Sequence, residues 1–219
     1  VASICKARVM ARGQQVCRLD YESLDSNVSL YVKDLVNAIS QHVGDYQCVV
    51  ISDYNKGVVS HALCRVVIDI ANDHQVPVIV DPKHDQVSKY AGATYITPNM
   101  AEFKQMVGDL VLDTDQNIES VAKKMLEDHD LDNILLTRSA DGMSLFTATE
   151  THHFPTFVSE VVDITGAGDT VVAALAYGVG LGLDQATIIT FANSAAGVVV
   201  SKVGTSNVSL DEIQAHDSV

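Results

Sequence analysis

The stretch Asp163-Ile164-Thr165-Gly166-Ala167-Gly168-Asp169-Thr170 lies between a strand-like segment and a long apolar helix predicted at roughly 168–181. At the start of such a helix, several backbone N–H groups have no partner and the positive end of the helix dipole is exposed. Gly166, Ala167 and Gly168 leave these amides uncovered, so a phosphoryl group can approach them closely. Asp169 can then act as a base toward an incoming hydroxyl. The stretch therefore predicts an anion hole beside a catalytic carboxylate, the arrangement that phosphoryl transfer requires.

A plainer interpretation of the same residues is a tight turn in which Asp169 caps the helix. Two other glycine motifs do not fit. A dinucleotide-binding fingerprint requires a third glycine where Val171 stands, and the chain contains no Gly-Lys-Ser/Thr ending of a P-loop. The choice between a turn and an anion hole therefore depends on the segments around this stretch.

Outward from this stretch, short apolar segments alternate with helical patterns. The predicted strands are Cys48–Ile51, Val76–Val80, Thr94–Thr97, Ile134–Thr137 and Met143–Thr147, followed by a proline-interrupted segment at His152–Phe157. The predicted helices cover 28–43, 60–71, 116–129, 168–181, 185–202 and 210–215. This alternation is typical of a parallel sheet covered on both faces. Ligands of such folds bind at the carboxyl ends of the strands, so we expect one polar edge that carries Asp53, Asp81, Asn99 and Thr137.

The first segment of the chain differs in character. Ile4–Met10 and Gln14–Leu19 are strand-like runs around Arg12-Gly13, which predicts a hairpin that protrudes from the sheet. The chain begins with Val1 rather than Met, and nothing precedes this strand-like segment. We therefore expect a fragment or a processed product.

Composition limits the function further. The 219 residues include 14 Lys and Arg against 28 Asp and Glu, a net charge of −14, and 47% are hydrophobic. Such a chain is globular rather than disordered, and its acidic balance disfavours nucleic acid and anionic membranes as partners. The longest apolar stretch, Val171–Leu183, is too short to span a bilayer, and no signal peptide is visible, so the cytoplasm is the expected location. The four cysteines form no framework pattern and are expected to be reduced, packed thiols.

The whole Asp163–Thr170 stretch resembles the carboxy-terminal signature of the ribokinase (PfkB) family of carbohydrate kinases, whose Asp-x-Thr-Gly-Ala-Gly-Asp loop holds the catalytic base and the anion hole. Thr97–Glu102 is similar to the family's Asn-x-x-Glu element. This likeness implies that Asn99 and Glu102 bind the nucleotide and that Glu102 orders Mg²⁺ through water. The resemblance implies ATP and Mg²⁺ as cofactors.

The resemblance also covers the rest of the nucleotide site. Thr137, Arg138 and Gly142 occupy the place of the nucleotide-contacting loop, and Arg138 follows a buried strand directly. Asn193–Val200 with Gly204-Thr205-Ser206 resembles the walls around adenine, which assigns Asn193 and Gly204 to the cofactor. The implied fold is a ribokinase-like three-layer α/β/α core at 23–219 with a mostly parallel central sheet, plus remnant lid strands at 1–22.

Within the family, several segments are similar to the bacterial heptose-7-phosphate kinase branch, which serves ADP-heptose and lipopolysaccharide core synthesis. These segments are Ser52–Gly57, Asp81-Pro82-Lys83, Thr97–Asn99, Leu136–Ser139 followed by Gly142–Leu145, and Ala192–Val200. The likeness implies transfer from ATP to the 1-hydroxyl of D-glycero-D-manno-heptose 7-phosphate. Asp53, Lys56 and Lys83 are candidates for sugar-phosphate binding, although an aspartate at a strand end can cap a turn and a lysine can be a solvated surface residue.

The chain also departs from the family pattern. The family's amino-terminal strand with its substrate-binding Asp has no counterpart, and neither does the nucleotidyltransferase domain of the heptose branch. We therefore expect the back two-thirds of a kinase domain, with the possibility of a homodimer through the lid by analogy. Two alternatives stay open, another sugar kinase of the same family and a non-catalytic nucleotide-binding module.

Overall fold

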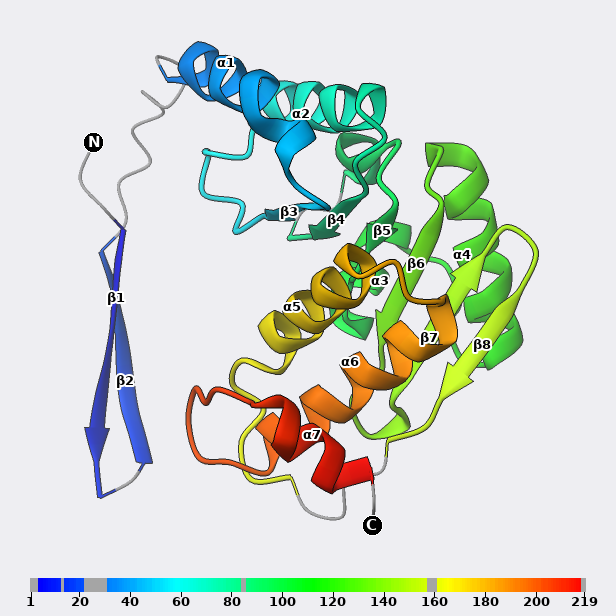
Figure 1. Cartoon of the computed structure of the whole chain (residues 1–219). Helices are drawn as coiled ribbons and strands as arrows, with labels where there is room; N and C mark the ends of the chain where they lie inside the picture. Colours follow the sequence, from blue (N-terminus) through cyan, green and yellow to red (C-terminus); the bar gives the residue numbers. More distant parts are fainter. Residues whose placement is uncertain (1–3, 13, 22–30, 84–85, 157–160, 218–219) are drawn as a thin grey trace.

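A six-stranded sheet runs through the body of the chain in the computed structural model, which describes residues 4–12, 14–21, 31–83, 86–156 and 161–217 (Figure 1). Its strands lie in the order of the sequence: β3 Val49–Ser52, β4 Val78–Asp81, β5 Tyr95–Ile96, β6 Asn133–Thr137, β7 Met143–Thr147 and β8 Thr151–Phe154. β3 to β6 are parallel, whereas β7 and β8 are antiparallel to their neighbours. The mostly parallel sheet predicted from the sequence is confirmed.

Helices cover both faces of this sheet, with two groups of them on opposite sides (Figure 1). One layer holds α1 Val32–His42, α2 His61–Asp73, α3 Met100–Val107 and α4 Asp115–His129. The other layer holds α5 Ala167–Gly180, α6 Gln185–Val200 and α7 Leu210–Asp217. Successive strand residues point to opposite faces, so Val78 and Val80 pack in the first core while Ile79 packs in the second. The result is the three-layer α/β/α architecture.

Local signals explain where most helices begin. The Ser60 side chain accepts a hydrogen bond from the Leu63 amide at the start of α2, and the Asp184 side chain accepts one from the Thr187 amide at the start of α6. The helix predicted at 28–43 lies partly outside the described residues, and α1 ends at His42, ahead of the short 3₁₀ turn η2 Val43–Asp45. Helix α3 is an element that the sequence patterns did not predict.

The predicted hairpin is present and stands beside the body of the molecule (Figure 1). Strands β1 Cys5–Ala11 and β2 Gln14–Tyr21 pair antiparallel and form a separate two-stranded sheet. Cys5 and Cys17 are exposed on this hairpin, whereas Cys64 is buried in the first core. All four cysteines are free, as expected. Because Cys5 and Cys17 are exposed, the expectation of packed thiols is wrong for these two.

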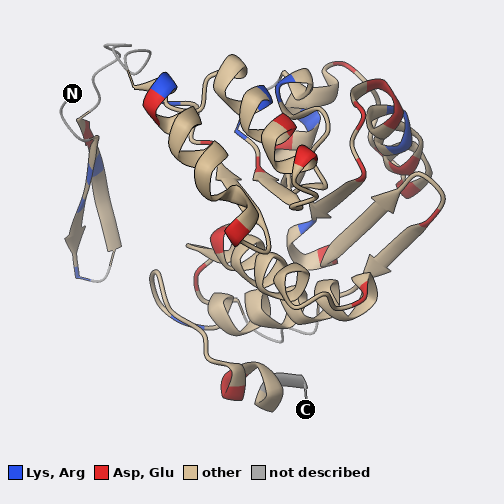
Figure 2. Ribbon diagram, turned by 45° about the horizontal axis from the view of Figure 1, so that its top comes forward, with Lys and Arg blue, Asp and Glu red and all other residues tan. Residues whose placement is uncertain are grey.

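Across the described ranges, no helix has the length and apolar character needed to cross a membrane. Figure 2 shows acidic positions on the helices of the body and basic positions along the hairpin.

Candidate active site

The polar residues that follow the parallel strands meet around one cleft of about 240 Å³. Asp53 follows β3, Asp81 ends β4, Asn99 follows β5 and Thr137 ends β6. The start of α5 closes the cleft with Gly166, Gly168 and Asp169. The full lining is Asp53, Tyr54, Asp81, Lys83, Thr97, Asn99, Glu102, Thr137, Gly166, Gly168 and Asp169. The structure thus brings residues far apart in the sequence to the single edge that the strand pattern predicts.

The loop before α5 is held by Asp163. One carboxylate oxygen accepts hydrogen bonds from the Thr165 amide at 2.9 Å and the Thr165 hydroxyl at 2.7 Å. The other accepts the Gly204 amide at 3.0 Å. These bonds hold the pKa of Asp163 below its usual range, because they stabilise the charged form. Asp163 is therefore a structural residue that fixes the shape of the loop.

Gly166 turns this loop into the helix with a φ of +84°, a conformation that glycine adopts without strain. The Ala167 amide donates to the Ile164 carbonyl at 3.2 Å, and the Thr170 amide donates to the Gly166 carbonyl at 2.9 Å. Within the described part of the chain, no acceptor is bonded to the amides of Gly168 and Asp169. An anion at this helix start would therefore be bound chiefly by these two amides, and Gly168 leaves open space above them.

Asp169 is exposed in the first turn of α5, at the boundary between the polar cleft and a second cavity of about 490 Å³. Gly166 and Asp169 line both cavities. The larger cavity is mostly apolar and lies between α5, α6 and the segment that leads to α7. Its walls include Tyr177, Phe191, Ala195, Thr205, Val208 and Ile213. Asp169 is thus the carboxylate that both cavities share.

Glu102 has two roles that the sequence pattern could not separate. Its side chain accepts a hydrogen bond from the Asn99 amide at 2.9 Å, while the Asn99 side chain accepts one from the Glu102 amide at 2.9 Å. This reciprocal capping box starts α3. The other Glu102 oxygen is bonded to the Lys83 ammonium, which raises the pKa of Lys83. The Asn-x-x-Glu element therefore builds a helix as well as lining the cleft.

Asp81 lies in the cleft close to other carboxylates. The pKa of Asp81 is raised to about 6, chiefly by burial and then by the negative charges of Glu102, Asp169 and Asp53, against a lowering effect of Lys83. The cleft is therefore rich in carboxylate oxygens at its centre.

Asp53 belongs to a buried cluster at the base of the cleft. Its carboxylate accepts hydrogen bonds from the Lys89 ammonium at 2.5 Å, the Tyr90 hydroxyl at 2.8 Å and the Asn55 amide at 2.8 Å. The side chains of Lys89 and Asp53 are 4% and 1% exposed. Sequence reasoning missed Lys89 and Tyr90, because nothing local marks a lysine for burial. The pairing leaves Asp53 as an anchor for the cleft floor.

Several predicted site residues do not line the cleft. Arg138 donates to Asp115 at 2.6 Å and to Ser144 at 3.2 Å, so its guanidinium links α4 to β7. Asn193 donates to the Pro155 carbonyl at 2.8 Å. Gly142 forms a turn at φ +78°, where a Cβ would lie 2.0 Å from the Phe154 carbonyl oxygen. Lys56, Ala167 and Gly204 also stand outside the lining.

Together, the fold and the family match define a class of enzyme: a phosphotransferase on a three-layer α/β/α fold, with an exposed carboxylate at the start of α5. The chain belongs to the pfkB family of carbohydrate kinases, whose family model matches residues 4–213.

Curated relatives agree with this membership. The chain is 44% identical over 213 residues to the bifunctional protein HldE of Proteus mirabilis and 43% identical over 211 residues to that of Trichlorobacter lovleyi. These matches cover 97% and 96% of this chain but 44% and 43% of the relatives, so the chain spans less than half of their length.

Two ribokinase structures share the fold. The Arabidopsis thaliana ribokinase complexed with ribose and ATP matches with a TM-score of 0.73 at 21% identity, over 82% of this chain and 58% of that one. The Thermotoga maritima ribokinase matches with a TM-score of 0.70 at 22% identity, over 93% of this chain and 65% of that one.

Proposed function

We propose that the chain transfers the γ-phosphoryl group of ATP to a sugar phosphate, specifically to the 1-hydroxyl of D-glycero-D-manno-heptose 7-phosphate. The observation that carries the proposal is the exposed carboxylate of Asp169 beside the unbonded amides at the start of α5. Similarity to HldE proteins over nearly the whole chain supports heptose 7-phosphate as the acceptor.

The transfer follows from the groups at the start of α5. The acceptor hydroxyl loses its proton to Asp169 while its oxygen forms a bond to the γ-phosphorus. The bond between that phosphorus and the β–γ bridging oxygen breaks, and ADP leaves with the electron pair. The amides of Gly168 and Asp169 stabilise the charge that the transferred group carries. The products are ADP and a sugar bisphosphate.

The carboxylate oxygens of the cleft also suit Mg²⁺, which prefers oxygen ligands and keeps several of its waters. The described residues contain no group of three close His, Cys, Asp or Glu side chains that would hold a metal directly. We infer that Glu102 and Asp81 hold the ion through water. When bound, Mg²⁺ supplies positive charge that offsets the charge of the phosphates.

We assign the remaining contacts by their position. Asn99 and Thr137 line the cleft beside the phosphates, and the adenine lies toward Asn193 and Gly204. Lys83 and Asp53 border the acceptor side of the cleft. The hairpin of β1 and β2 acts as a lid, and its apolar face offers a contact for a second copy of the chain. We expect Arg138 and Gly142 to shape the nucleotide loop rather than to touch ATP.

The test is ³¹P NMR of the purified protein with ATP, Mg²⁺ and one acceptor at a time. The acceptors are heptose 7-phosphate, unphosphorylated heptose, fructose 6-phosphate and ribose. We expect an anomeric phosphate signal and ADP with heptose 7-phosphate, and much weaker transfer to the others. Preferred transfer to another acceptor would overturn the heptose assignment. ATP binding without transfer to any acceptor would overturn the kinase assignment in favour of a nucleotide-binding module.

A further inference from the structure

The hairpin has two chemically different faces. Along paired strands successive side chains alternate, so Cys5, Ala7 and Val9 share one face with Cys17, Leu19 and Tyr21. The opposite face carries the pairs Lys6 with Asp20 and Arg8 with Arg18. All of these side chains except Ala7 are exposed. The hairpin is therefore apolar on one side and charged on the other.

The charged face is strongly basic for this protein. The hairpin contains Lys6, Arg8, Arg12 and Arg18 against the single carboxylate of Asp20, in a chain of net charge −14. Arg8 and Arg18 stand directly opposite each other across the two strands. Like charges in this relation destabilise a pair of strands unless an anion lies between them. Such a pair on an acidic protein indicates a place for an anionic ligand.

Asp20 already orients one member of the pair. The Arg18 guanidinium donates to both carboxylate oxygens of Asp20, from Nε at 2.8 Å and from Nη2 at 2.9 Å. The Lys6 ammonium lies 4.0 Å from the same carboxylate. The Asp20 carboxylate therefore serves two cations, Arg18 and Lys6. A phosphate fits this arrangement, because guanidinium groups bind it through paired hydrogen bonds.

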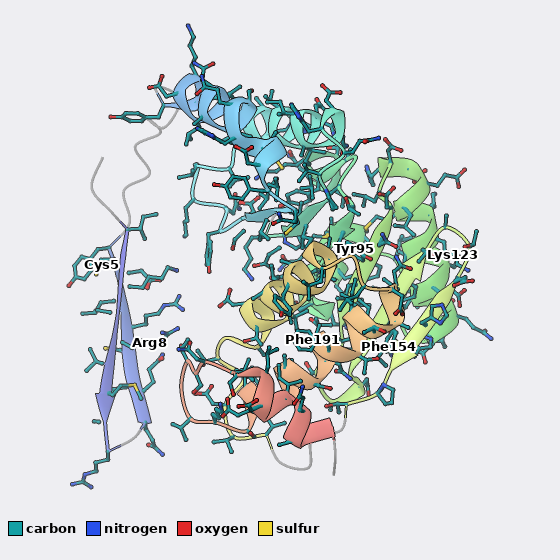
Figure 3. The ribbon with its side chains drawn as sticks, in the orientation of Figure 1. Cys5, Arg8, Tyr95, Lys123, Phe154 and Phe191 are labelled. Carbon is teal, nitrogen blue, oxygen red and sulfur yellow. The ribbon has the colours of Figure 1, made fainter. Side chains whose placement is uncertain are left out.

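The charged face is turned toward the body of the molecule. Figure 3 shows Cys5 and Arg8 on opposite sides of the hairpin, with Arg8 on the side of the body. The pKa of Asp163 is lowered first by its bonds from Thr165 and Gly204, and also by the charge of Arg8. The pKa of Asp20 is lowered first by Arg18, and also by the charge of Lys56. The charge of Arg8 therefore acts on the loop before α5, in agreement with its position on the side of the body.

We propose that Arg8 and Arg18 bind the phosphate group that the acceptor already carries, and so select sugar phosphates over unphosphorylated sugars. This inference rests on the proposed function. The transferred phosphoryl group lies at the start of α5, so the acceptor's own phosphate, at the far end of the sugar, needs a separate site. Lys83 is already bonded to Glu102 within the cleft, whereas Arg8 and Arg18 lie opposite each other on the hairpin.

The test compares Arg8→Gln, Arg18→Gln and Arg8→Lys with the matched control Arg12→Gln. Arg12 lies at the hairpin tip with a φ of +51°, so its replacement removes the same charge away from the pair. Loss of a charge-assisted hydrogen bond weakens binding roughly ten- to hundredfold. We expect Arg8→Gln and Arg18→Gln to raise the KM for heptose 7-phosphate by that factor. The KM for ATP and the slow transfer to unphosphorylated heptose stay unchanged. Arg8→Lys restores part of the loss.

Calorimetric titration with heptose 7-phosphate in the absence of ATP measures the affinity of the same site without turnover. Weaker binding by Arg8→Gln, together with wild-type binding by Arg12→Gln, supports the proposal even if no phosphoryl transfer is found. Absence of transfer by the wild type contradicts only the proposed function. Unchanged KM and unchanged binding in both glutamine variants overturn the proposal. An equal loss in Arg12→Gln overturns it as well, because general charge would then explain the effect.

Discussion

Replacement of Gly168 is expected to affect the stability of the fold and the rate of phosphoryl transfer in opposite directions. A Cβ at this position meets nothing within 4 Å, and alanine is a better helix former than glycine. We expect Gly168→Ala to leave the free energy of unfolding equal or raise it by up to about 1 kcal/mol. Because the methyl group occupies the space above the free amides, phosphoryl transfer falls by at least about tenfold.

Urea unfolding and a steady-state kinase assay measure the two effects. The control is Gly180→Ala at the other end of α5, where a Cβ lies 3.5 Å from the Gln47 Cβ, an ordinary contact. The control keeps full activity. Wild-type activity in Gly168→Ala would mean that no anion approaches these amides.

Asp81 links the acidic cleft to the pH dependence of stability. Its pKa rises from 3.8 to about 6 on folding, chiefly through burial. Because the folded state binds the proton more tightly, the stabilisation is complete below about pH 4 and is lost as the pH rises through 6. A rise of this size corresponds to about 3 kcal/mol for a fully buried group, and partial solvent access reduces it to about 1 kcal/mol.

Asp81→Asn removes the carboxylate and keeps the shape of the side chain. We expect the variant to be more stable than the wild type by about 1 kcal/mol at pH 7.5 and equally stable at pH 4. Urea unfolding at the two pH values measures the difference. An equal gain at both values would show that the charge of Asp81 is not responsible.

At the scale of elements, α3 shows how one motif serves structure and chemistry together. Glutamine at position 102 can still accept the Asn99 amide, so Glu102→Gln keeps the capping box but removes a negative charge from the cleft. We expect its free energy of unfolding to stay within about 0.5 kcal/mol of the wild type, whereas Glu102→Ala loses about 1 kcal/mol. Half-maximal activity of Glu102→Gln requires more Mg²⁺.

Magnesium titration of the kinase rate, paired with thermal unfolding of both variants, separates the two roles. A wild-type Mg²⁺ requirement in Glu102→Gln would leave Glu102 with helix capping alone.

The elements themselves were largely predictable, because continuous apolar runs and helical spacing report burial directly. Strands β3 to β7, six of the helices and the hairpin lie where these patterns indicate. Helix α3 was missed although it has eight residues, as many as the predicted helix α7. Its signal was the Asn99-x-x-Glu102 spacing itself, which is a capping-box signature as well as a family motif.

At the scale of the whole molecule, the site was only partly predictable. The residues at strand ends were found because parallel topology sends them to one edge, as for Asp81 and Thr137. Partners chosen by tertiary packing were not found. The buried Lys89 beside Asp53 and the pairing of Arg138 with Asp115 depend on neighbours 36 and 23 residues away. Local patterns carry no information about such distant contacts.

The proposed binding of two phosphorylated ligands by an acidic chain depends on where its charges lie. Figure 2 shows acidic residues on the helices and basic residues on the hairpin. These basic residues and the amides at the start of α5 are the groups that would provide local positive potential. A few placed groups can therefore bind phosphate despite a net charge of −14.

The most direct measurement is the single-turnover rate of phosphoryl transfer to heptose 7-phosphate by the wild type and by Asp169→Asn, with ATP affinity measured in parallel. Asparagine has nearly the same shape but cannot take a proton from the acceptor hydroxyl. If Asp169 is the base, the rate falls by about 10²- to 10⁴-fold while ATP affinity changes little. An undiminished rate in Asp169→Asn would contradict the assignment of Asp169 as the catalytic base.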